Sequence, residues 1–316
     1  MPQLADKQTE RLLAGMKDNP APKLYELPVN DARNMLKEVT KLLQLPPCEV
    51  GKVKDFSITY EDGEYNSRIY FPFDNSQNIT PATILYHGGG FMLGDIDTHD
   101  SIARFLCLNT GHKIISVDYR LAPEFVFPTG LEDCYHALEW VYNNAEKFSI
   151  DQNNISILGD SAGASLCAGV AQLSRQRSGP NIASIVMLYP CCDVRLDTDY
   201  PSRALYGDGD YFLGIKDLAW IKDGYCKNED SGTNPLISPL KITEFGGWPR
   251  TLVLTAGMDM LRDEAKCFYQ LLLQNSVKAD YLTYDGTIHG FVTFAGAIDS
   301  GKSCLADIAQ YLINVE

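Results

Sequence analysis

The sequence lacks three features that mark specialised classes of protein. No uninterrupted apolar run approaches the roughly 18 residues that a membrane-spanning helix needs. Residues 1–22 mix charged with apolar side chains, so the apolar stretch of a secretory signal peptide is missing. The nine cysteines show no CxxC spacing, the pattern typical of zinc or redox sites. We therefore expect a soluble, cytoplasmic protein whose cysteines are reduced and mostly buried.

Positive charge is also scarce. The 27 Lys and Arg residues are outnumbered by 41 Asp and Glu residues, which gives a formal net charge of -14. Such a chain repels polyanions, so nucleic acid and anionic membranes are not expected partners. The five histidines show no HExxH or related spacing, and we expect neither a metal nor another cofactor. The length of 316 residues accommodates one or two domains.

From residue 83 onward, short apolar runs alternate with longer segments of helical period, which predicts βαβ units on a mostly parallel sheet. An antiparallel hairpin is predicted earlier, over residues 53–60 and 67–71, with its turn around Asp62 and Gly63. The later predicted strands are 83–86, 113–117, 155–158, 182–188, 251–255 and 280–284. The predicted helices are 98–109, 131–147, 162–176, 262–274 and 302–313.

Two segments do not fit this alternation. Residues 1–50 have an amphipathic, helical pattern, and residues 194–245 are rich in aromatic residues, glycine and aspartate without a strand pattern. We call them the covering segments, because we expect both to pack over the sheet as a lid. The alternative is a solvated terminal helix and an irregular insertion.

The predicted strand 155–158 leads into Gly159, Asp160, Ser161, Ala162 and Gly163, and a predicted helix follows at once. This is the GxSxG pattern in the strand-turn-helix context of a nucleophile elbow. The sharp turn lifts the serine hydroxyl above the sheet, and glycine on both sides lets strand and helix approach closely. Ser161 is therefore the candidate nucleophile.

Three consecutive glycines, Gly88, Gly89 and Gly90, follow the predicted strand 83–86. Their unshielded N–H groups, together with the Ala162 N–H at a helix start, are suited to an oxyanion hole. Which two of the three glycines donate stays open. A phosphate-binding loop or a plain flexible turn is the alternative, but neither GxGxxG nor a Walker lysine accompanies the run.

A nucleophilic serine requires a base, and the base requires an orienting carboxylate. His289 is the only histidine after Ser161, and it follows the predicted strand 280–284. Asp259 follows the predicted strand 251–255, at the end of a strand where α/β proteins build their sites. We favour Asp259 as the acid over Asp263 and Glu264, which fall in a predicted helix and suit its amino-terminal dipole.

The remaining histidines have structural interpretations. His87 is expected to support the glycine loop through hydrogen bonds. His99 either holds that loop or caps a helix. His112 and His136 have no supporting context and are expected at the surface or in the core.

Several ordered motifs occur together in this chain. They are HGGGF at 87–91, GDIDTHD at 94–100, DYRLAPE at 118–124, GDSAG at 159–163, NP at 234–235, SP at 238–239 and LRDE at 261–264. Through them the chain resembles the hormone-sensitive-lipase-like branch of the α/β-hydrolases, and in particular its bacterial acetyl esterases. Met260, where this family commonly has proline, and Ala164, where it often has glycine, are departures that remove no chemical group.

The resemblance implies an eight-stranded, mostly parallel sheet flanked by helices, with a core of residues 51–193 and 246–316 and a helical cap of residues 1–50 and 194–245. It implies a triad of Ser161, Asp259 and His289 that hydrolyses short-chain carboxylic esters, acetyl to butyryl, without a cofactor. The expected partner is a small ester, and a homodimer is the candidate assembly.

Two other functions stay open at this stage. The same triad could hydrolyse amides or lactones, because an acyl-transfer site does not reveal its leaving group. A member of the fold that binds a small ligand without catalysis is the other alternative. Phe91, Tyr206, Phe212 and Trp220 are the side chains expected to set the size of the acyl pocket.

Overall fold

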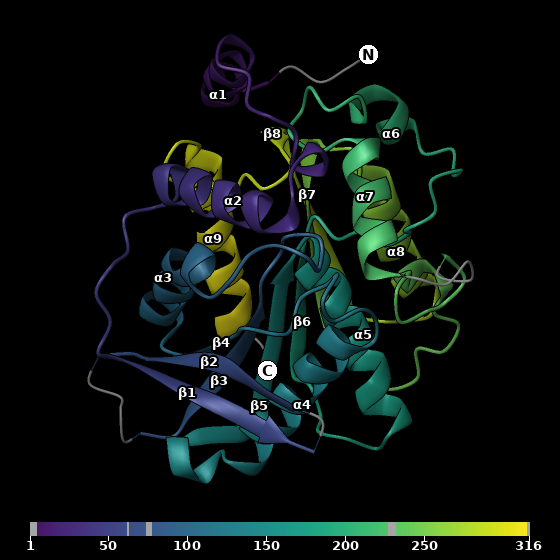
Figure 1. The fold of residues 1–316 in the computed structure, drawn as a ribbon. Coiled ribbons are helices and arrows are strands. Elements are labelled where there is room, and N and C mark those ends of the chain that lie inside the picture. Colours follow the sequence, from purple (N-terminus) through teal and green to yellow (C-terminus); the bar gives the residue numbers. More distant parts are fainter. Residues whose placement is uncertain (1–4, 62, 74–77, 227–231, 315–316) are drawn as a thin grey trace.

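A central sheet organises the molecule. The computed structural model describes residues 5–61, 63–73, 78–226 and 232–314 (Figure 1). The strands are β1 (Lys52–Tyr60), β2 (Gly63–Phe71), β3 (Thr80–Tyr86), β4 (Lys113–Val117), β5 (Ile150–Asp160), β6 (Ser184–Leu188), β7 (Arg250–Met258) and β8 (Ala279–Ile288). They form one eight-stranded sheet in the order β1-β2-β4-β3-β5-β6-β7-β8.

The sheet is parallel except at one side. β2 pairs antiparallel with both β1 and β4, whereas every other neighbouring pair is parallel. The predicted mostly parallel sheet and its leading hairpin are therefore confirmed, although Asp62 of the hairpin turn lies outside the described residues. β5 begins at Ile150, earlier than predicted, because residues 151–154 are polar and give no apolar signal.

Helices cover both faces of the sheet. They are α1 (Lys7–Asp18), α2 (Val29–Leu43), α3 (Asp100–Thr110), α4 (Thr129–Asn143), α5 (Ala162–Gln176), α6 (Pro201–Tyr206), α7 (Ile215–Tyr225), α8 (Arg262–Gln274) and α9 (Asp299–Ile313). Short 3-10 turns include η1 (Leu24–Glu26), η2 (Asp97–His99), η3 (Glu146–Phe148) and η5 (Pro239–Lys241). The predicted helix 131–147 is in fact α4 followed by η3, and the last helix starts three residues before its predicted start at 302.

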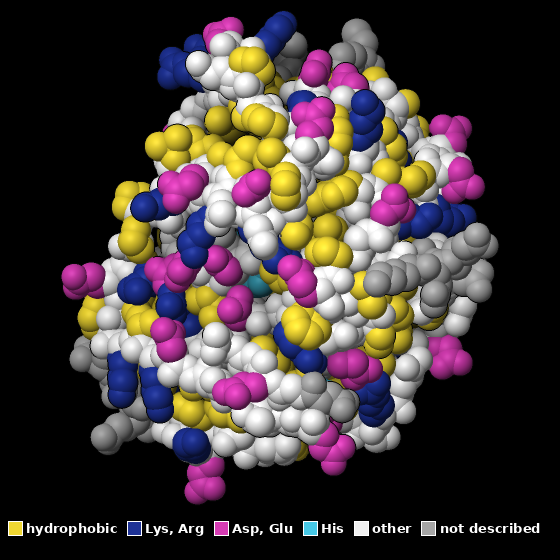
Figure 2. Space-filling view, viewed as in Figure 1, with side chains coloured by type: hydrophobic (Ala, Val, Ile, Leu, Met, Phe, Trp, Pro, Cys, Tyr) yellow, Lys and Arg dark blue, Asp and Glu magenta, His cyan; other side chains and the backbone are white. Residues whose placement is uncertain are grey.

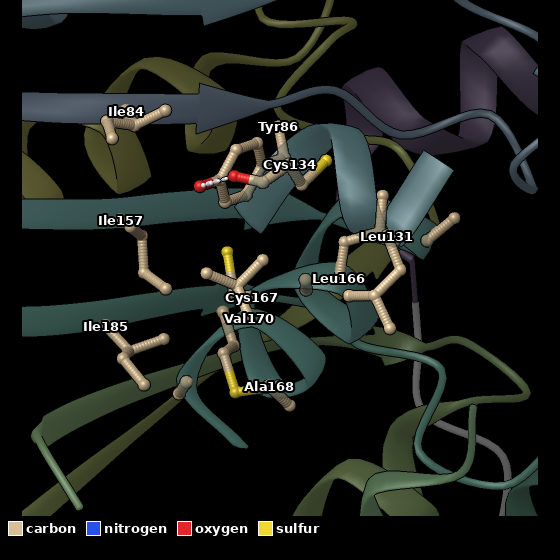
Figure 3. Packing of buried hydrophobic residues seen from close by; sticks show 14 of the residues in the cluster. Ile84, Tyr86, Leu131, Cys134, Ile157, Leu166, Cys167, Ala168, Val170 and Ile185 are labelled. Atoms are coloured by element: carbon tan, nitrogen blue, oxygen red, sulfur yellow. Dashed lines mark hydrogen bonds between the residues drawn. The ribbon is translucent and has the colours of Figure 1, made fainter. Parts of the chain in front are cut away.

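Alternation along each strand separates the core into two layers. Ile84 and Tyr86 of β3 belong to one buried cluster and Leu85 to the other, as the twofold period of a strand requires. Figure 3 shows Ile84 and Tyr86 with Cys134 of α4, and the Tyr86 hydroxyl donates to the Cys134 carbonyl oxygen at 2.9 Å. Helices α3 and α9 pack against the opposite layer.

Helices α1, α2, α6 and α7 of the covering segments lie in the upper half of the molecule in Figure 1. Figure 2 shows hydrophobic side chains gathered on the surface between α1 and α2 and beside α7. All nine cysteines carry free thiols, and seven of them are buried. Within the described residues, no helix has both the length and the apolar character that crossing a bilayer demands.

Candidate active site

Ser161 occupies the sharp turn between β5 and α5. Its backbone φ of 52° lies in the left-handed region, which is unusual for a residue with a Cβ atom. A Cβ atom on Gly163 would overlap the carbonyl oxygen of Tyr86, and one on Gly159 would overlap the backbone of Gly163. The two flanking glycines therefore allow β3, β5 and α5 to meet closely, and the turn presents Ser161 at the carboxyl end of β5.

Asp259 and His289 follow directly after β7 and β8. Asp259 Oδ2 lies 2.7 Å from His289 Nδ1, and His289 Nε2 lies 2.9 Å from Ser161 Oγ. The second carboxylate oxygen of Asp259 accepts the N–H of Leu261 at 2.9 Å. Both Asp259 and His289 are buried. The carboxyl ends of parallel strands thus bring carboxylate, imidazole and hydroxyl into one continuous chain of contacts.

Asp263 and Glu264, the competing acids, are occupied elsewhere. Asp263 accepts the N–H of Ser202 at 2.8 Å. Glu264 accepts the N–H of Cys192 at 2.8 Å and forms a buried ion pair with Arg203. Both acids lie in the first turn of α8, as expected. Their side chains also anchor residues 192–203 to the start of that helix.

The three consecutive glycines are not equivalent. The N–H of Gly88 donates to Asp160 Oδ1 at 2.8 Å, so it is turned away from the serine. Gly89 and Gly90 adopt φ values of 115° and 63° and line the pocket. In the described part of the chain, no acceptor receives the N–H of Gly89, Gly90 or Ala162. Gly89 and Gly90, rather than Gly88, are therefore the candidate oxyanion donors among the three glycines, together with Ala162.

A buried histidine-carboxylate pair fixes the glycine loop. Asp160 Oδ1 lies 2.9 Å from His99 Nε2, and His99 Nδ1 lies 2.9 Å from Thr98 Oγ1. Burial alone would raise the pKa of Asp160, but the His99 imidazole and the Gly88 N–H hold it below its usual value. His99 therefore holds the glycine loop, and its side chain does not cap α3.

His87 supports the same loop from within the protein. Its Nδ1 lies 2.8 Å from the Gly88 carbonyl oxygen, and its ring stacks on Tyr119 with centroids 4.3 Å apart. Burial lowers the pKa of His87 to about 4, so the ring is neutral near pH 7. A neutral, fully enclosed imidazole suits loop support, as the sequence predicted.

The other two histidines lie away from Ser161. His112 is buried and its Nδ1 lies 3.0 Å from Thr83 Oγ1. His136 is half-buried, and its ring centroid lies 4.1 Å from that of Tyr60. Both therefore have packing roles.

A pocket opens above Ser161, between the sheet and the covering segments. Its lining residues are Leu24, Leu36, Thr40, Gly88, Gly89, Gly90, Leu93, Thr98, His99, Asp160, Ser161, Tyr189, Phe212, Leu213, Asp217, Trp220, Ile221, His289, Gly290, Thr293 and Phe294. Phe212 and Trp220 are in the wall, as expected. Phe91 and Tyr206 are not, which corrects the prediction. Phe91 stacks on Tyr225 at 4.0 Å, and Tyr206 is completely buried.

Several wall residues carry no recognisable sequence signal. Leu24 and Leu36 lie far from Ser161 along the chain and reach the pocket only because η1 and α2 fold over the sheet. Tyr189 follows β6, and its ring centroid lies 4.7 Å from that of His289. Asp217 is a carboxylate in an otherwise apolar part of the wall. Only the fold brings these residues together.

The described residues contain no group of three or more His, Cys, Asp or Glu side chains placed to hold a metal ion. A hydroxyl linked through imidazole to a carboxylate is the arrangement of nucleophilic acyl transfer.

Comparison with known proteins identifies the family of this chain. A family model described as the alpha/beta hydrolase fold matches residues 83–293. The carboxylic ester hydrolase LipN of Mycobacterium tuberculosis is 36% identical over 247 residues, covering 76% of this chain and 64% of LipN. The acetyl esterase of Salmonella paratyphi B is 31% identical over 255 residues, covering 79% of this chain and 76% of that enzyme.

The solved structures include the ester hydrolase EH1AB1 from the metagenome of Lake Arreo. It superimposes with a TM-score of 0.93 at 32% identity, and the match covers 98% of each chain. The similarity therefore includes the covering segments as well as the sheet. The chain belongs to the α/β-hydrolase family, in its hormone-sensitive-lipase-like branch of carboxylic ester hydrolases.

Proposed function

We propose that this protein hydrolyses short-chain carboxylic esters, acetyl to butyryl, through Ser161, His289 and Asp259. The observation that carries the proposal is the continuous set of contacts from Asp259 through His289 to Ser161 Oγ. A carboxylate that holds one imidazole nitrogen directs the other nitrogen toward the hydroxyl proton.

The reaction begins when Ser161 Oγ attacks the ester carbonyl carbon and its proton passes to His289 Nε2. The Gly89, Gly90 and Ala162 N–H groups are the donors that stabilise the oxyanion of the tetrahedral intermediate. His289 then protonates the leaving alkoxide, and the alcohol departs. A water molecule attacks the acyl-enzyme and gives its proton to His289, which returns that proton to Ser161 as the carboxylic acid leaves.

The covering segments shape the specificity in this proposal. We assign residues 1–50 and 194–245 to a cap and residues 51–193 and 246–316 to the hydrolase core. Leu36 of the first segment and Trp220 and Ile221 of the second supply apolar surface above Ser161. Each methylene in such a pocket contributes about 1–3 kcal/mol, so kcat/KM should change gradually with acyl length.

The test is hydrolysis of p-nitrophenyl acetate by the wild type and by Ser161→Ala. We expect the variant to lose about a million-fold in kcat while its circular dichroism spectrum stays unchanged. Ser303→Ala, an exposed serine on α9, is the matched control and should retain full activity. Turnover retained by Ser161→Ala would contradict the proposal. p-Nitroacetanilide, the matched amide, should be hydrolysed far more slowly than the ester, and the opposite ranking would favour an amidase.

We also propose that the enzyme acts in the cytoplasm without a cofactor, as a homodimer or a monomer. Sedimentation of the purified chain distinguishes the two assemblies. Dialysis against EDTA should leave kcat unchanged, because every group in the proposed reaction belongs to the chain itself.

A further inference from the structure

Asp217 places a carboxylate in the wall of the substrate pocket. It lies in the first turn of α7, is 6% exposed and lines the same cavity as Ser161 and His289. Its neighbours in the wall from the same segment are Phe212, Leu213, Trp220 and Ile221, which are all apolar. A charged group in such surroundings affects every ligand that enters.

Helix capping explains only part of this placement. Asp217 Oδ2 accepts the N–H of Gly214 at 2.9 Å, which caps the start of α7. A capping carboxylate does not need to line a pocket, as the half-buried Asp6 at the start of α1 shows. In the part of the chain that the structure describes, Asp217 forms no ion pair with Lys or Arg. Its charge therefore lacks a direct counter-ion.

The charged groups around Asp217 do not neutralise the charge of its carboxylate. Burial raises its pKa, whereas the Gly214 N–H, the Lys23 ammonium and His289 act in the opposite direction. Lys23 is exposed, and its Nζ donates to the Gly209 carbonyl oxygen at 3.0 Å, so water screens its charge. The wall of the pocket therefore contains a carboxyl group that has no direct counter-ion among the described residues.

We propose that Asp217 is a specificity-determining residue. It makes this site select neutral and cationic esters over esters that also carry a free, ionised carboxylate. The inference rests on the proposed ester hydrolysis. A half-ester of a dicarboxylic acid would bring its free carboxylate into a partly desolvated pocket that already holds one, and like charges at close range disfavour binding.

The experiment compares kcat/KM for dimethyl succinate and monomethyl succinate at about pH 8, where the half-ester is an anion. The two esters share the reacting bond and differ in the charge at the far end. Asp217→Asn keeps the shape and an oxygen for the Gly214 N–H while removing the charge. Asp223→Asn, an exposed carboxylate on the same helix, makes the identical change in net charge outside the pocket.

We expect Asp217→Asn to lower the preference for the diester by about tenfold and Asp223→Asn to leave it unchanged. The ratio is used because Asp217 also interacts with His289, so the absolute rates of both esters can shift together. An unchanged ratio in Asp217→Asn, or an equal change in both variants, overturns the inference.

A binding measurement separates this inference from the proposed function. On the Ser161→Ala background, dissociation constants for the two esters are measured by quenching of tryptophan fluorescence, since Trp220 lines the pocket. If the wild type hydrolyses neither ester, the proposed function fails, and the dissociation constants still decide the role of Asp217. Tighter binding of the half-ester after Asp217→Asn supports the inference, and unchanged binding rejects it.

Discussion

His99 Nε2 lies 2.9 Å from Asp160 Oδ1, the same oxygen that accepts the N–H of Gly88. Asp160 immediately precedes Ser161, so one buried carboxylate joins the nucleophile turn to the glycine loop. The position of the proposed oxyanion donors relative to Ser161 therefore depends on Asp160 and His99, two side chains that take no part in the proposed reaction steps.

His99→Gln should lower kcat for p-nitrophenyl acetate by about 10- to 100-fold with little change in KM. Removal of a whole oxyanion donor costs about 100- to 1,000-fold, and a displaced loop should cost less. A loss of stability alone would lower the amount of active enzyme rather than the kcat of the folded fraction. His136→Gln, a half-buried histidine outside the pocket, is the control and should keep the wild-type kcat.

The same substitution has a pH signature. The lowered pKa of Asp160 stabilises the fold above the usual pKa of a carboxyl group, and this contribution is lost as pH falls through the lowered value. Without His99 the pKa of Asp160 rises, so acid unfolding should begin at higher pH. Urea unfolding of both proteins between about pH 3 and 6 checks this, and coincident curves would contradict it.

Gly163→Ala should destabilise the fold by at least about 3 kcal/mol, because the new Cβ atom would overlap the Tyr86 carbonyl oxygen and neither backbone segment can move freely. Gly15→Ala is the matched control in α1, where nothing lies within 4 Å of the added atom. That change should stabilise the helix by up to about 1 kcal/mol. The midpoints of urea unfolding measure the stability of both variants. Equal effects would contradict the close contact assigned to Gly163.

Arg33 ties α2 to the core. Its Nε donates to the Met92 carbonyl oxygen at 2.8 Å, and its guanidinium pairs with Glu124 at 2.7 Å. Arg33→Ala should raise KM several-fold, because Leu36 on the same helix lines the pocket, and lower the free energy of unfolding by about 1–3 kcal/mol.

Lys37→Ala provides the contrast for Arg33. Lys37 pairs with the half-buried Asp95 and the exposed Asp97 and is itself 45% exposed, so these pairs should contribute at most about 1 kcal/mol. Equal effects of the two substitutions on KM would show that α2 does not depend on the Arg33 contacts.

Two buried histidines should make the fold sensitive to mild acid. Burial lowers the pKa values of His87 and His112 to about 4. Between about pH 6.5 and 4 the unfolded chain binds protons that the folded chain does not, so stability falls as pH decreases across this window. Each histidine can contribute up to about 3 kcal/mol. His112→Gln should flatten the pH dependence, and an unchanged slope would refute this assignment.

Local sequence determined much of the fold. Apolar period placed the central strands β4, β6 and β7 and the helices α5 and α8, because side-chain spacing along an element depends only on that element. The GxSxG turn was also recognisable, because Gly159 serves a contact within one strand-turn-helix unit, the close approach of β5 to the backbone of Gly163. The sequence could also name Asp259 and His289, because His289 is the only histidine after Ser161 and each residue lies a few positions beyond a predicted strand, although β7 and β8 in fact run on to Met258 and Ile288.

Tertiary structure alone decided what depends on partners distant in the chain. Asp160 accepts the N–H of Gly88, which lies 72 residues away in the chain. This hydrogen bond leaves only the N–H groups of Gly89 and Gly90 in the glycine run as candidate oxyanion donors. The carboxylate of Glu264 pairs with Arg203 and accepts the N–H of Cys192. Its position in the first turn of a helix does not reveal either partner. The wall of the pocket combines residues of both covering segments, including Asp217, with residues that follow the strands of the sheet. These parts are distant in the chain, so their meeting depends on packing rather than on any local pattern.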